Sequence, residues 1–66
     1  MKVTINHKEA EVAEGATLAD VLAQHGLDGP GYASAIGMKV VRRDERATRV
    51  VQEGDDIIVI KAVCGG

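Results

Sequence analysis

The fold of this chain is decided by residues 53–66, which read EGDDIIVIKAVCGG. Residues 53–56 are typical of a turn. The uninterrupted β-branched run Ile57–Ile60 that follows is typical of a central strand buried on both faces. We expect this strand to continue through residues 61–63. The sequence therefore predicts a domain over residues 1–63 and a flexible C-terminal tail over residues 64–66 that ends in Gly-Gly.

The length of 66 residues fits one small domain. A chain of this size buries only about 60% of the surface that its unfolded form exposes. A deep catalytic cleft is therefore not expected, and we predict that the protein is not an enzyme. Hydrophobic residues make up 45% of the chain and charged residues 27%, which is the composition of a globular domain.

Composition also argues against several classes of function. The chain has no Trp, no Phe and a single Tyr, so it lacks the aromatic platforms on which nucleic-acid bases stack. Its net charge of −2 disfavours binding to a phosphate backbone. One cysteine makes no internal disulfide and fits a reducing, cytoplasmic setting. No apolar run approaches the roughly 20 residues of a membrane span.

Working back from the final strand, apolar periodicity predicts the remaining elements. Alternation over residues 2–6 and 10–13 predicts a hairpin. A helix over residues 18–25 is predicted by its apolar spacing, by the pair Thr17 and Asp20, which is typical of a capping box, and by Gly26. Two further strands are expected over residues 32–36 and 39–42, with an irregular segment over 43–49.

These elements predict an α+β fold in which one helix packs across a mixed sheet of four to five strands. The first and last strands are expected to lie side by side. The predicted core consists of Val3, Ile5, Val12, Leu18, Val21, Leu22, Val40, Val51, Ile58 and Ile60. The outward face of the run Ile57–Ile60 is interpreted either as a shallow apolar surface for partners or as a surface covered by residues 43–49.

The terminal glycine pair is the feature that carries chemistry. Two residues without side chains can be threaded, extended, into a narrow slot of another protein. A terminal carboxylate is ionised at neutral pH and is a poor electrophile. To react with sulfur or an amine it must first be activated, most simply as an acyl-adenylate.

Four stretches carry a resemblance to a known family: GATLADVL (15–22), AIGMKVVRR (35–43), EGDDI (53–57) and AVCGG (62–66). They resemble the ThiS-type sulfur carrier proteins of thiamin biosynthesis, which belong to the ubiquitin-like β-grasp superfamily. The resemblance covers essentially the full chain. The Gly-Asp turn before the last predicted strand, together with the glycine pair, is its most specific part.

The resemblance implies a mechanism in which this chain is a carrier. An adenylating enzyme, related to ubiquitin-activating enzymes, uses ATP to activate the carboxylate of Gly66. Sulfur from a donor such as a cysteine desulfurase converts that group into a thiocarboxylate, and thiazole synthase takes the sulfur. Gly66 carries the chemistry and Gly65 gives access to it. No cofactor is expected to be bound by the chain itself.

Two related functions and one unrelated function stay open at this point. The chain is also interpretable as the small subunit of molybdopterin synthase, or as a ubiquitin-like modifier conjugated to lysines through Gly66. These alternatives share the activation step and differ in the acceptor. The third alternative is a plain interaction module in which the glycines have no chemical role.

Several other residues are candidates for a role at the site. Cys64 is interpreted either as a thiol that accepts the acyl group or exchanges sulfur, or as a small tail residue that faces a partner. Arg42, Arg43 and Arg46 are interpreted either as a docking patch for an acidic partner surface or as solvated charges on an edge strand. No metal site is expected, because His7 and His25 are isolated in the sequence. Met38 and Tyr32 are interpreted either as exposed contacts for partners or, the favoured interpretation, as residues that cover the edge of the core.

Overall fold

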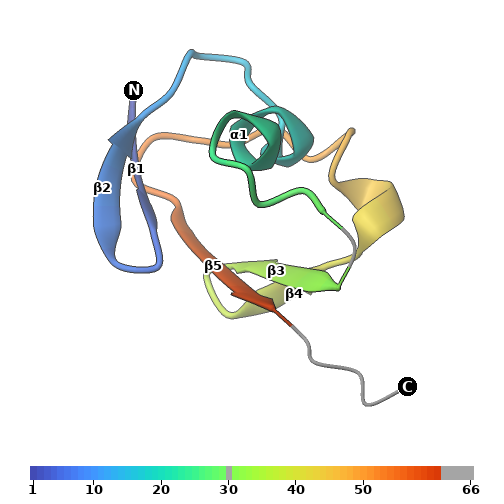
Figure 1. Ribbon diagram of the computed structural model, residues 1–66. Helices are drawn as coiled ribbons and strands as arrows, with labels where there is room; N and C mark the ends of the chain where they lie inside the picture. The colour runs from blue at the N-terminus through green and yellow to red at the C-terminus, as the bar shows by residue number, and fades with distance from the viewer. Residues whose placement is uncertain (30, 62–66) are drawn as a thin grey trace.

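The computed structural model describes residues 1–29 and 31–61. Along the chain it contains β1 (Lys2–Ile5), β2 (Lys8–Glu11), α1 (Leu18–Gln24), β3 (Tyr32–Ile36), β4 (Lys39–Val41), the 3-10 helix η1 (Arg43–Glu45) and β5 (Asp56–Lys61) (Figure 1). The predictions made for the tail, for Cys64, Gly65 and Gly66, and for the boundary after residue 63 lie outside the described residues.

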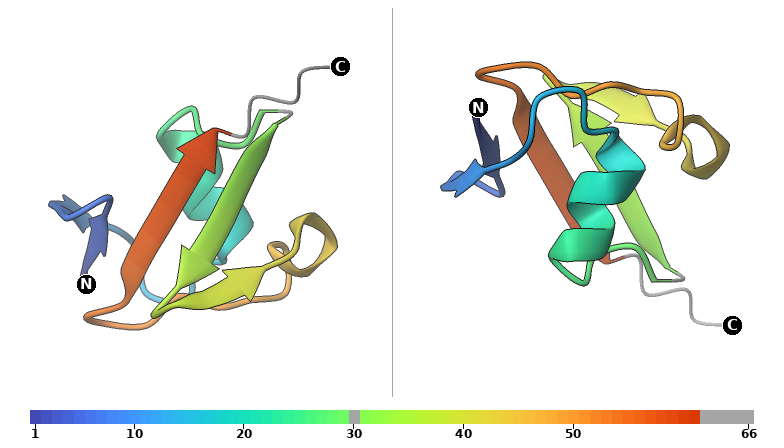
Figure 2. Two further views of the ribbon diagram at one scale, coloured as in Figure 1. Left: turned by 90° about the horizontal axis from the view of Figure 1, so that it is seen from below. Right: turned by 90° about the horizontal axis from the view of Figure 1, so that it is seen from above.

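The five strands form one mixed sheet in the order β2-β1-β5-β3-β4. β5 lies at the centre, parallel to β1 and antiparallel to β3, and the hairpins β1–β2 and β3–β4 flank it. The helix α1 crosses one face of this sheet (Figure 2). The predicted α+β fold is therefore confirmed, including the pairing of the first and last strands.

The helix α1 begins at the capping box that the sequence predicts. The Thr17 hydroxyl accepts from the backbone N–H of Asp20 at 3.2 Å, and the Asp20 carboxylate accepts from the backbone N–H of Thr17 at 3.2 Å. Gly26 has a φ of 70°, the left-handed conformation that ends a helix. With seven residues α1 is short, and among the described residues no helix has the length and apolar character needed to cross a membrane.

The core lies between α1 and the sheet. Its buried side chains are Val3, Ile5, Val12, Leu18, Val21, Leu22, Ile36, Val41, Val51, Ile57 and Val59. Three residues predicted for the core lie on the opposite face of the sheet: Val40, Ile58 and Ile60. Side chains alternate between the two faces of a strand, so a phase error of one residue exchanges the faces. The predicted burial of β5 on both faces is also wrong, because no described element covers the face that carries Ile58 and Ile60.

Both hairpins turn through two residues. Asn6 and His7 connect β1 to β2 with φ values of 52° and 71°. Gly37 and Met38 connect β3 to β4 with φ values of 55° and 72°. Positive φ at both central residues defines the type I′ turn, whose twist matches that of the flanking strands.

Candidate functional site

The face of the sheet opposite α1 carries an apolar patch on β3, β4 and β5. Register places Ala33 opposite Ile60, and it places Ala35 between Ile58 on β5 and Val40 on β4. These five side chains share one face, because the alternate residues of the same strands point into the core. We call Ala33, Ala35, Val40, Ile58 and Ile60 the outer apolar face.

The outer apolar face is exposed and slightly concave. Val40 is 76% exposed and Ile60 is 61% exposed. The two alanines of β3 lie between larger side chains on both neighbouring strands, and a shallow hollow of about 90 Å³ lies there. In the view from below, β5 and β3 lie in front of α1, and no other described element covers them (Figure 2). Contiguous exposed apolar surface of this kind marks an interaction site.

The interpretation that residues 43–49 cover this face is wrong. The segment packs on the helix side, where the carbonyl oxygens of Arg46 and Arg49 accept from the backbone N–H groups of Ala19 and Leu18 at 3.0 and 2.8 Å. The outer apolar face therefore agrees with the alternative interpretation, a surface open to partners.

The outer apolar face ends next to Lys61, the last residue that the structure describes. Ile60 precedes Lys61, the last residue of β5, whose ammonium nitrogen lies 5.9 Å from the centroid of the Tyr32 ring. Five residues follow Lys61, and an extended chain of that length spans at most about 18 Å. A protein that holds residue 66 therefore also lies close to the Ile60 end of this face.

Of the three arginines predicted to form a docking patch, Arg46 is not available for docking. Arg42 and Arg43 are exposed, and the Nη2 of Arg43 donates to the carbonyl oxygen of Gly29 at 2.7 Å. Arg46 is only 5% exposed. Its Nε donates to Ser34 Oγ at 2.9 Å and its Nη2 donates to the Tyr32 carbonyl oxygen at 2.7 Å. Arg46 thus ties the segment after η1 to β3, and its charge is not displayed to a partner.

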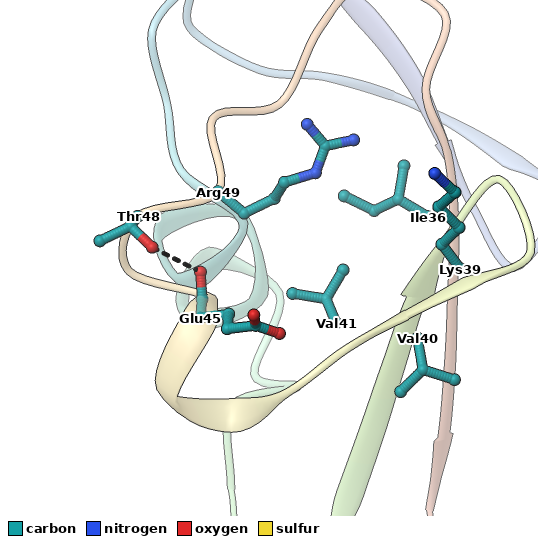
Figure 3. Close-up of a pocket in the computed structure, with 7 residues that line it drawn as sticks. All are labelled: Ile36, Lys39, Val40, Val41, Glu45, Thr48 and Arg49. Atoms are coloured by element: carbon teal, nitrogen blue, oxygen red, sulfur yellow. Dashed lines mark hydrogen bonds between the residues drawn. The ribbon is translucent and has the colours of Figure 1, made fainter.

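A larger hollow of about 510 Å³ lies at the edge of the sheet between β4 and residues 45–49. Ile36 and Val41 line it, Lys39 and Arg49 flank it, and Val40 points away from it (Figure 3). The Thr48 hydroxyl donates a hydrogen bond to the Glu45 carbonyl oxygen at 3.1 Å. The described residues contain no group of three His, Cys, Asp or Glu side chains placed to hold a metal ion.

The two residues expected at the edge of the core have different surroundings. Tyr32 is half-buried and packs against the core, which confirms the prediction for this residue. Met38 is 97% exposed, so the favoured interpretation is wrong for Met38, and its contact with a partner stays a prediction. The sequence separates the two residues, because the predicted strands over 32–36 and 39–42 place Tyr32 in a strand and Met38 in the turn between the strands.

Comparison with known proteins adds a family and a fold. The family model described as "ThiS family" matches residues 2–66. The sulfur carrier protein ThiS of Escherichia coli (strain K12) is 32% identical over 66 residues, which cover 100% of both chains.

Two solved structures from Geobacter metallireducens show the same fold. The crystal structure of a thiamine biosynthesis protein (ThiS) superposes with a TM-score of 0.85 at 22% identity, covering 100% of both chains. The solution structure of a thiamine biosynthesis protein has a TM-score of 0.78 at 21% identity and covers 100% of this chain and 88% of that chain. The five-stranded mixed sheet with one helix is thus a ubiquitin-like β-grasp.

Proposed function

This chain belongs to the ThiS family, and we propose that it carries sulfur as a thiocarboxylate on Gly66. It is a sulfur carrier protein of thiamin biosynthesis, and it acts as a carrier for partner enzymes rather than as a catalyst. The match to the family runs through residue 66, which supports this position for the sulfur.

The proposed chemistry needs three partners. An adenylating enzyme joins the Gly66 carboxylate to the AMP part of ATP and releases pyrophosphate, which turns a poor electrophile into a reactive one. The persulfide of a donor such as a cysteine desulfurase then attacks the acyl group and displaces AMP, and a thiol reductant cleaves the resulting acyl disulfide to leave the thiocarboxylate. Thiazole synthase is the proposed acceptor of that sulfur. Gly65, which has no side chain, lets the end of the chain enter a narrow active site.

We also propose that the outer apolar face docks on the adenylating enzyme. The observation that carries this proposal is the continuity of the face with β5, since Ile58 and Ile60 lie on the strand that runs into the tail. Exposed Arg42 continues the same face beyond Val40 and supplies a positive rim. The complementary partner surface is apolar at its centre and acidic at the β4 side.

The position of the sulfur is tested by weighing the intact protein after incubation with the adenylating enzyme, ATP and a sulfur donor. The expected mass gain is the difference between one sulfur and one oxygen, located at Gly66 by fragmentation. A variant without Gly65 and Gly66 is expected to gain nothing. An unchanged mass of the wild type, with a ThiS relative converted in parallel, would show that this proposal is wrong.

The docking face is tested by adding one negative charge to it. Val40→Glu and Ile60→Glu are each expected to raise the Kd for the adenylating enzyme by at least about 30-fold, because they place an unpaired carboxylate in an apolar contact. Gln24→Glu adds the same charge to the exposed end of α1, on the other side of the sheet. It is expected to change the Kd by less than about 2-fold. Equal effects of the three variants would refute the docking face.

A further inference from the structure

The strand β4 forms one edge of the sheet and directs backbone hydrogen-bonding groups away from it. Gly37 donates to the Asp56 carbonyl oxygen at 3.0 Å, and in an antiparallel pair the hydrogen-bonded positions recur at every second residue. Ala35 is therefore hydrogen-bonded to β5. Val40, which lies opposite Ala35, directs its N–H and C=O away from β3. In the part of the chain that the structure describes, no backbone group bonds to Val40 across this edge.

These backbone groups of Val40 face the hollow of about 510 Å³ beside β4. Val40 is one of the residues that line the hollow, although its side chain points away from it (Figure 3). The backbone of Val40 is consequently the part that borders the hollow, in agreement with the strand register. The buried side chains of Ile36 and Val41 form an apolar floor there. The hollow thus joins an open strand edge to an apolar surface.

The charged groups around the hollow differ between its two ends. The Lys39 ammonium and the Arg49 guanidinium lie on either side of the Ile36 side chain (Figure 3). Both residues are exposed, and neither forms a salt bridge with a described carboxylate. In the same view the Glu45 carboxylate lies beside Val41. The Ile36 end therefore suits an acidic side chain, and the Val41 end does not.

A strand added at this edge has its side chains in a fixed order. The residue opposite Val40 exchanges both backbone hydrogen bonds with it and directs its side chain toward the outer apolar face. The residues on either side of it point into the hollow, one toward Lys39 and the other toward Val41. An acidic side chain opposite Lys39 and an aliphatic one opposite Val41 match the two ends of the hollow.

We propose that the edge of β4 binds an extended peptide segment of a partner protein. The segment adds a strand to the sheet, with an acidic side chain opposite Lys39 and apolar side chains opposite Val40 and Val41. A second copy of β4 matches this edge poorly, because its own Lys39 adds a positive charge to the hollow. The inference goes beyond the proposed function and does not depend on the chemistry at Gly66.

The test uses the capped peptide acetyl-Gly-Ser-Val-Val-Glu-Ser-Gly-amide and the full chain. Antiparallel alignment places the second Val of the peptide opposite Val40 and its Glu opposite Lys39. Titration followed by NMR should give a Kd below about 1 mM. The peptide with Lys in place of Glu, and the peptide N-methylated at the second Val, should each bind at least about 10-fold more weakly. No binding of the Glu peptide at about 5 mM would overturn the proposal.

Charge reversal separates the hollow from the other basic groups of the chain. Lys39→Glu should weaken binding of the Glu peptide at least about 10-fold and should strengthen binding of the Lys peptide. Lys8→Glu is the matched control, because Lys8 follows the first two-residue turn as Lys39 follows the second. It should change either Kd by less than about 2-fold. Equal losses in the two variants would refute binding at the β4 hollow.

Amide hydrogen exchange shows whether the peptide pairs with the backbone of β4. The Val40 N–H should exchange rapidly in the free protein, and peptide at about ten times its Kd should slow the exchange about 10-fold. Signal changes confined to Ala33 and Ile60, with unaltered exchange at Val40, would place the peptide on the outer apolar face and overturn the proposal. A Val40 N–H already protected in a self-associated free protein would assign the edge to a second copy and also overturn it.

Discussion

The hairpins β1–β2 and β3–β4 turn through two residues each, with φ values that agree within a few degrees. They flank the same central strand, yet they differ in what their side chains do. Asn6 accepts from the backbone N–H of Val59, and its own N–H donates to the Ile57 carbonyl oxygen at 2.8 Å. The Asn6 side chain thus continues the hydrogen bonding between the parallel strands β1 and β5 beyond the end of β1. The corresponding residue of the second turn, Gly37, makes the equivalent backbone bond, to the Asp56 carbonyl oxygen at 3.0 Å, but it has no side chain to add a second one.

The outward faces of the two hairpins differ in the same sense. The first presents Lys2, Thr4, Glu9 and Glu11, whereas the second presents Ala33, Ala35 and Val40. Thr4 is engaged within the fold, since its hydroxyl donates to Asp56 Oδ1 at 2.8 Å. Turns of the same geometry therefore flank a hairpin that is tied to β5 by side chains on one side and a hairpin that carries the proposed docking face on the other. Four sets of substitutions test this division, in order of decreasing effect.

The largest loss of stability is expected at Arg46, which attaches the second hairpin to the rest of the fold. Arg46→Ala leaves the Tyr32 carbonyl oxygen without its guanidinium donor and opens space beside Ser34. We expect the free energy of unfolding to fall by about 3 kcal/mol, measured by urea denaturation. Arg42→Ala removes an exposed arginine four residues earlier and should cost less than about 0.5 kcal/mol. Similar losses for both variants would contradict the structural role of Arg46.

The next largest effect is expected at Asn6, in the first hairpin. Asn6→Ala removes the acceptor of the Val59 N–H. It also puts alanine at a positive φ, which alanine tolerates less well than asparagine. Together the two changes should lower the free energy of unfolding by about 2 kcal/mol. Asn6→Gly removes only the hydrogen bond and should cost about 1 kcal/mol. Thermal unfolding of the two variants separates the cost of the lost hydrogen bond from the cost of alanine at positive φ. If Asn6→Gly is as stable as the wild type, the side chain does not hold the first turn to β5.

The neighbours Val40 and Val41 test which face of the second hairpin is buried. Val41 is 7% exposed and Val40 is 76% exposed. Val41→Thr puts a hydroxyl into the core and should cost about 1.5 kcal/mol, whereas Val40→Thr should cost less than about 0.5 kcal/mol. Chemical denaturation of this matched pair gives the difference directly. A reversed order of the two losses would mean that the faces are exchanged.

The smallest effect is expected at His7, which has a φ of 71° and is exposed. His7→Gly removes a Cβ from the left-handed region and should raise the free energy of unfolding by about 0.5 kcal/mol. The affinity for the adenylating enzyme should stay unchanged, because the first hairpin lies outside the proposed interface. A weakened complex would extend that interface across β5 and remove the contrast between the hairpins.

The sequence predicted the elements better than it predicted their faces. Polar and apolar residues alternate over 2–6, which indicates which side chains of β1 face the core, and Val3 and Ile5 are buried as expected. The run Ile57–Ile60 and the pair Val40-Val41 contain no polar residue that shows which side chains face the core. The prediction placed the outward side chains of both segments in the core. The alternation Ala33-Ser34-Ala35 would have misled in the same way, because the polar Ser34 is the buried residue and the two alanines lie on the outer face.

Residues whose roles depend on distant contacts were not predictable in this way. Arg46 stands in a run of charged residues, which indicates exposure, and it is buried because residues 43–49 fold back toward α1 and β3. Met38 has its exposure set by the turn rather than by its own hydrophobicity. Arg42 and Arg43 are exposed as the docking prediction requires, and their contact with a partner stays a prediction.

Because β5 is the central strand, the sheet can be completed only after the last strand of the chain has been synthesised. Thr4 and Asp56 are 52 residues apart, yet they pair across the sheet, and both hairpins need β5 as a neighbour. A ribosome adds roughly 5–20 residues per second from the N-terminus, so the sheet lacks its middle until residues 56–61 have emerged. A chain that stops before them has neither a closed core nor an outer apolar face. The proposed docking face therefore exists only in a chain that has been made almost to residue 66.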